Sequence, residues 1–86
     1  MKGTTSNGFE FELSQARLNN MELVDALAEL EDNPLRIGRV CQLLLGKEQQ
    51  KRLYEFVRDD EGIVPVDAVE STISEIMSSG SKDSKK

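Results

Sequence analysis

A proline at position 34 divides the apolar middle of this 86-residue chain, so no single long helix can run through it. The residue before a proline is pushed out of the α region, and the helix that precedes it must therefore end near Asp32. Asn33 can cap the next helix, with Pro34 in its first turn, where the missing N–H costs nothing. Gly46 predicts the end of that second helix at about Leu45. The chain is expected to fold into short, separately packed helices.

Four segments carry apolar residues at helical spacing, each with one stripe that can face a core. The first helix begins after Asn19 or Asn20, either of which can cap it through the side-chain carbonyl. The third runs from about Lys47 to Arg58, and the fourth starts at Pro65. The expected inner stripes are Leu23, Val24, Leu27 and Leu30; Ile37, Val40, Cys41 and Leu44; Leu53, Phe56 and Val57; and Val66, Val69, Ile73, Ile76 and Met77.

The N-terminal segment predicts a β-strand, because apolar residues alternate with glutamate from Phe9 to Leu13. Asn7-Gly8 before it suits a type I′ turn, which would pair this strand with Lys2–Ser6 in a hairpin over about residues 2–13. A flexible polar tail is expected over about residues 79–86, which contain no apolar side chain. The predicted fold is mainly α: one domain over residues 1–78, a small bundle of about four short helices with an N-terminal strand or hairpin.

The chain contains one cysteine and no histidine, which limits the disulfide, metal and catalytic sites that it can form. A lone cysteine forms no internal disulfide, and structural zinc needs four nitrogen or sulfur ligands. Cys41 lies on an expected inner stripe, so a core thiol is favoured over a nucleophile. No apolar run matches a secretory segment or approaches the ~20 residues of a membrane span. A soluble intracellular protein that is not an enzyme, with no cofactor, metal or membrane partner, is expected.

Charge is segregated along the chain. Formal charges sum to −5 over residues 1–33, +4 over 34–58, −6 over 59–80 and +2 over the last six residues, which gives the net −5. The two central helices are therefore basic, and the segments on either side are acidic. At a pI of about 4.7, phosphate would be repelled by both flanks, so nucleic acid is disfavoured as a partner.

Two faces of the basic central helices are candidate partner-binding surfaces. They are either simply solvated or dock an acidic partner, which includes a second copy of the chain. In the docking hypothesis Leu43 is the apolar anchor, on a helix face turned away from the core, with arginines beside it. By helical geometry the first face holds Arg36, Arg39 and Leu43, and the second holds Lys47, Lys51, Tyr54 and Arg58.

Three segments in this order resemble the small tail assembly chaperones of long-tailed phages and prophages of Gram-positive bacteria. The segments are NGFEFELS, NNMELVDALAELEDNPL and VCQLLLGKEQQKRLYEFVRDDEGIVPVDAV, and the resemblance covers about residues 7–77. The resemblance contains no catalytic motif, and the chain inherits no active residues from it. It rests on the order and spacing of the segments.

This resemblance implies a non-catalytic helper in the host cytoplasm that is absent from the mature virion. Such a protein keeps the tape-measure protein soluble while tail-tube subunits polymerise around it. The family often makes a second, longer product by ribosomal frameshifting. The alternative hypothesis is a small phage or prophage regulatory protein associated with DNA.

Overall fold

The computed structural model describes residues 1–84 of the chain. Within them the structure is mainly helical with a two-stranded N-terminal hairpin, which confirms the predicted fold class. The long axis of the molecule measures 40 Å and the short axis 19 Å. The elements are β1 (Lys2–Thr4), β2 (Glu10–Glu12), α1 (Gln15–Leu18), α2 (Met21–Asp32), the 3₁₀ helix η1 (Pro34–Arg36), α3 (Ile37–Leu45), α4 (Lys47–Val57) and α5 (Val66–Ser84).

The predicted hairpin is present, with β1 and β2 antiparallel and Gly3 opposite Phe11. The predicted type I′ turn is wrong. That turn needs a positive φ at both central residues, whereas only Gly8, at φ 97°, has one here. The Gly8 N–H donates to the Thr5 carbonyl, and the Thr5 N–H donates to the Phe9 carbonyl. The loop therefore contains three residues rather than two.

Asparagine side chains set the helix boundaries, as predicted. The Asn20 side chain accepts from the Glu22 N–H at the start of α2, and the Asn33 side chain accepts from the Leu35 N–H. The second helix opens as a short 3₁₀ turn before it becomes α3. Gly46 ends α3 at φ 88°, a backbone conformation that favours glycine.

The core lies between the hairpin and α2, α3, α4 and α5. The inner stripe predicted for α3, Ile37 to Leu44, is confirmed as buried. Leu45, which lies off that stripe, is also buried. The hairpin and the other helices contribute Phe9, Phe11, Leu13, Leu23, Ala26, Leu53, Val69, Ile73 and Ile76.

Three residues assigned to inner stripes are exposed instead. Val24 is 49% exposed, Phe56 46% and Val66 53%. On α2 the buried residues are Leu23, which was assigned to the stripe, and Ala26, which was not. The buried face is therefore rotated away from Val24. The apolar periodicity predicted the helix correctly, but it did not predict which face of the helix packs against the core.

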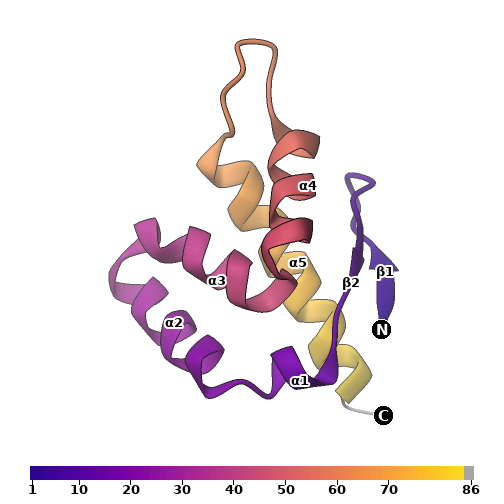
Figure 1. Ribbon diagram of the computed structural model, residues 1–86, viewed down its shortest axis with the longest axis vertical. Coiled ribbons are helices and arrows are strands. Elements are labelled where there is room, and N and C mark those ends of the chain that lie inside the picture. The colour runs from indigo at the N-terminus through magenta and orange to yellow at the C-terminus, as the bar shows by residue number, and fades with distance from the viewer. Residues whose placement is uncertain (85–86) are drawn as a thin grey trace.

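The helices follow one another around the core, as Figure 1 shows. Helix α2 packs against α3, α3 against α4, and α4 against α5. The hairpin lies on the right of this view and α2 on the left. Two hydrogen bonds tie Ser6 of the hairpin loop to Glu75 of α5, at 2.6 and 2.9 Å. Asn7 and Thr72 make a third contact between the same elements, at 3.4 Å.

Helix α5 extends further than its apolar pattern. It runs to Ser84, so residues 79–84 of the predicted flexible tail continue the helix, while Lys85 and Lys86 lie outside the described residues. Each residue added to an existing helix gains a backbone hydrogen bond, and no proline follows Pro65 to stop it. None of the described helices is long and apolar enough to cross a membrane.

Candidate protein-binding surface

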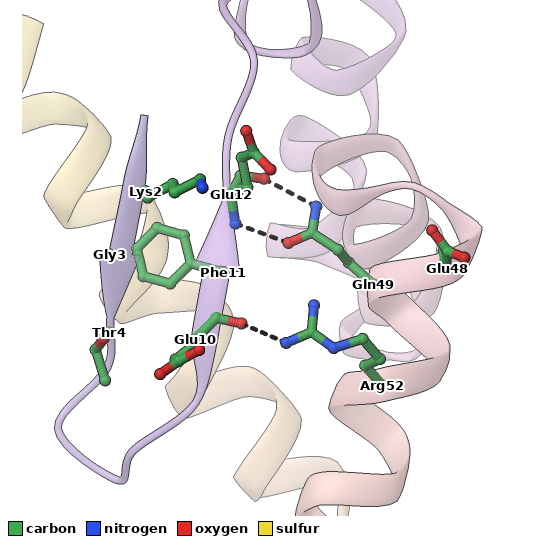
Figure 2. A pocket seen from close by; sticks show the side chains of 9 residues that line it. All are labelled: Lys2, Gly3, Thr4, Glu10, Phe11, Glu12, Glu48, Gln49 and Arg52. Carbon is green, nitrogen blue, oxygen red and sulfur yellow. Dashed lines mark hydrogen bonds between the residues drawn. The ribbon is translucent and has the colours of Figure 1, made fainter.

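Side chains of α4 cover the outer edge of β2 (Figure 2). The Glu12 N–H donates to Gln49 Oε1 at 2.7 Å, and Gln49 Nε2 donates to the Glu12 carbonyl at 2.8 Å. One turn further along α4, Arg52 Nη2 donates to the Glu10 carbonyl at 3.0 Å. Residues three apart share a helix face, so both side chains reach the same strand. These bonds fix the hairpin relative to α4.

An open groove with an apolar floor lies beside this contact. The rings of Phe9 and Phe56 meet at a tilt of 56°, with centroids 5.5 Å apart. The guanidinium carbon of Arg52 lies 5.4 Å from the Phe9 ring centroid, within the range of a cation–π contact. Phe9 is buried, whereas Phe56 is 46% exposed. The hairpin–α4 groove is lined by Gly8, Phe9, Glu10, Glu48, Lys51, Arg52, Glu55 and Phe56.

The groove carries both signs of charge at its rim. Lys51 and Arg52 are exposed there, as are Glu48 and Glu55. A hydrogen bond from Arg58 lowers the pKa of Glu55, and the positive charges of Arg58 and Lys51 act in the same direction. Glu55 is therefore already in an ion pair with Arg58, at the C-terminal end of the same helix. Among the described residues, Lys51 is an exposed cation of the groove outside any ion pair, and Arg52 is exposed beside it although it also donates to the Glu10 carbonyl.

The side chains of the second predicted face differ in their exposure and in their contacts. Lys47 and Lys51 are exposed on α4, and Lys51 lines the groove. Tyr54 is half-buried against the core, and its hydroxyl accepts a hydrogen bond from Gln50 Nε2 at 3.1 Å. Arg58 donates to Glu55 and to the Gly62 carbonyl, both at 2.8 Å, so it stabilises the loop after α4.

The first predicted face is divided in the same way. Arg36 and Arg39 are exposed, and Arg36 Nε lies 3.7 Å from a carboxylate oxygen of Glu29. Leu43 is half-buried and packs against the core, so its expected position on an outward face is wrong. The unpredicted helix α1 packs against α3 at this end, where Arg17 Nη1 donates to the Leu43 carbonyl at 3.4 Å.

Sequence reasoning missed the aromatic half of the groove. Phe56 was assigned to the core, although Arg52, four residues earlier on the same helix face, marks that face as solvated. The i, i+3 pair of Gln49 and Arg52 was a readable signal, because both side chains can reach one strand edge. The sequence did not indicate that β2 is the strand beside these two side chains.

Cys41 is fully buried, as predicted for a core thiol. Burial raises its pKa from 9.0 to about 12. A thiol with so high a pKa is almost entirely protonated at neutral pH, and the thiolate is the nucleophilic form. Among the residues that the structure describes, no cluster of cysteine and acidic side chains is placed to hold a metal ion.

Comparisons with known proteins give no match: no family model, no curated protein and no solved structure is similar to this chain.

Proposed function

We propose that this protein is a phage tail assembly chaperone, a non-catalytic module that binds the tape-measure protein and keeps it soluble during assembly of the tail tube. The proposal is supported by the order of the segments that resemble that family. On this proposal the protein works in the host cytoplasm and is left out of the mature virion.

One observation carries the binding role: an aromatic side chain is left half-exposed beside two exposed cations. Phe56 rests on Phe9 with one side open, and Lys51 and Arg52 lie at the rim of the same groove. Aromatic and arginine side chains supply much of the energy of protein interfaces, and charged rims set orientation. The hairpin–α4 groove therefore suits an apolar segment with acidic neighbours on a partner.

The proposal expects a gene for a very long coiled-coil protein beside this one, and the test is co-expression of the two proteins, followed by measurement of the soluble fraction of the long one. The wild-type chain is expected to keep that protein in the supernatant. Phe56→Ser and Lys51→Glu are expected to lose most of this effect while their circular dichroism stays helical. Ile63→Ser is the matched control, because Ile63 is also apolar and is 55% exposed, but it lies in the loop before α5.

Two results would count against the proposal. One is a long protein that is equally soluble without this chain. The other is a mobility shift of random duplex DNA at micromolar protein that weakens steeply as salt rises, because that is the behaviour of a DNA-associated regulator.

A further inference from the structure

Helix α2 is apolar on two opposite sides. Its inner side packs on the core through Leu23 and Ala26. On the other side Met21 is 65% exposed and Val24 49%, and Ala28 is exposed as well. At 100° per residue these three positions fall within an arc of about 60°, and they extend over about two turns. We call them the outer stripe of α2.

Carboxylates border the outer stripe on both sides. The helix contains five acidic residues and no lysine or arginine. By helical geometry Asp25 and Asp32 lie along one border and Glu31 along the other. Among the described residues, the only α2 carboxylate in an ion pair is Glu29, which is held 3.7 Å from an exposed Arg36. The remaining carboxylates are open to a cationic ligand.

We propose that the outer stripe docks an amphipathic helix of a partner protein in which lysine or arginine residues flank an apolar stripe. An apolar stripe at positions i, i+3 and i+7 matches the spacing of anchors on a second helix. The acidic borders meet the partner's cations and repel an acidic segment. A copy of the same α2 is a poor occupant, because it would bring carboxylates against carboxylates.

This surface goes beyond the proposed function and does not rest on it. Figure 1 places α2 on the left of the molecule and the hairpin with α4 on its right. The two surfaces also differ in charge: the groove carries lysine and arginine as well as glutamate, whereas the outer stripe is bordered by carboxylates alone. One molecule can therefore hold an acidic segment and a basic helix at the same time.

The experiment uses fluorescence anisotropy with two labelled model peptides of about 18 residues, a length that supports helix formation. One peptide places leucines at i, i+3, i+4 and i+7 with lysine elsewhere, and the other has glutamate in place of lysine. We expect the lysine peptide to bind at least about tenfold more tightly than the glutamate peptide. The double variant Met21→Ser/Val24→Ser keeps the charge and should weaken binding of the lysine peptide by about tenfold.

The control Ile63→Ser removes an apolar side chain of similar exposure outside α2, and it should bind the lysine peptide as the wild type does. Equal binding by the double variant would overturn the proposal, because binding would then depend on net charge alone. So would failure of the lysine peptide to bind, or equal binding of both peptides. Sedimentation that shows self-association of the wild type, lost in the double variant, would assign the stripe to a second copy. None of these readouts uses Phe56 or the tape-measure protein, so failure here is separable from failure of the proposed function.

Discussion

The ionisation of the Cys41 thiol depends on whether the core is folded. Cys41 lies on the inner stripe of α3 with its thiol shielded from water, and it packs in the same cluster as Val40 and Leu44. Desolvation disfavours the charged form of any buried group, and for a thiol this raises the pKa. Folding therefore favours the neutral thiol. The free energy of unfolding should depend on pH wherever the thiol is neutral in the folded chain and ionised in the unfolded chain.

We expect the free energy of unfolding to fall between pH 9 and pH 12 because of Cys41. In the unfolded chain the thiol ionises near its ordinary pKa of 9.0, whereas the folded chain holds it neutral up to about 12. The stabilisation is therefore fully present below pH 9 and is lost as pH rises through the folded pKa. One proton is involved, so the slope is at most about 1.4 kcal/mol per pH unit.

Urea titrations of wild type and Cys41→Ala across this range would measure the effect. Tyrosine and lysine ionisation is common to both proteins, and only the wild type should carry the additional slope. Parallel pH profiles of the two proteins would contradict the burial of the thiol.

At the scale of elements, Gln49 acts as a substitute for a neighbouring strand. Met1 and Leu13 exchange both of their backbone hydrogen bonds across the hairpin, and in an antiparallel pair such residues alternate with others that point outward. Glu10 and Glu12 are the outward residues of β2. The amide of Gln49 offers Glu12 the donor and the acceptor that a strand would offer, which protects an edge that could otherwise pair with another chain.

Gln49→Ala is expected to lower the free energy of unfolding by about 1 kcal/mol, because two hydrogen bonds with Glu12 are replaced by bonds to water. It should also raise light scattering at high concentration, because the edge of β2 becomes open. Urea midpoints and static light scattering would measure the two effects. Lys51→Ala alters an exposed residue of α4 that makes no hydrogen bond to β2, and it should change neither quantity. Equal changes in both variants would show that the edge is not what Gln49 protects.

Element boundaries could be predicted from the sequence, whereas contacts between elements could not. The caps of Asn20 and Asn33 and the end of α3 at Leu45, before Gly46, are local properties, and all three are confirmed. The short α1 carries no apolar periodicity. Ser14 caps it locally, and Arg17 ties it to α3 through the Leu43 carbonyl, a contact that only the fold reveals. The groove was missed for the same reason, because it depends on which helix the hairpin meets.

At the scale of the whole molecule, one carboxylate joins the two ends of the described chain. Glu75 accepts hydrogen bonds from the N–H and the hydroxyl of Ser6, which lies 69 residues earlier. We expect Glu75→Ala to release the hairpin from α5 and to cost about 1 kcal/mol, since both bonds are exposed to water. Amide hydrogen exchange should accelerate in residues 2–13 and stay unchanged in α3 and α4. The neighbouring Ser74→Ala is the control, and uniform acceleration along the chain would contradict a local tie.

The position of that tie has a consequence for the order in which the chain folds. Helices α2, α3 and α4 contact their neighbours in sequence, so each contact closes only a short loop. The contact between the hairpin and α5 joins residues that are 69 positions apart in the sequence. Closing so long a loop costs conformational entropy before any of its contacts form. The helices are therefore expected to associate first, with the hairpin docking on α5 after the rate-limiting barrier. Substitutions at Ser6 and Glu75 should then speed unfolding and leave the refolding rate nearly unchanged, whereas substitutions at Val40 or Leu44 should slow refolding.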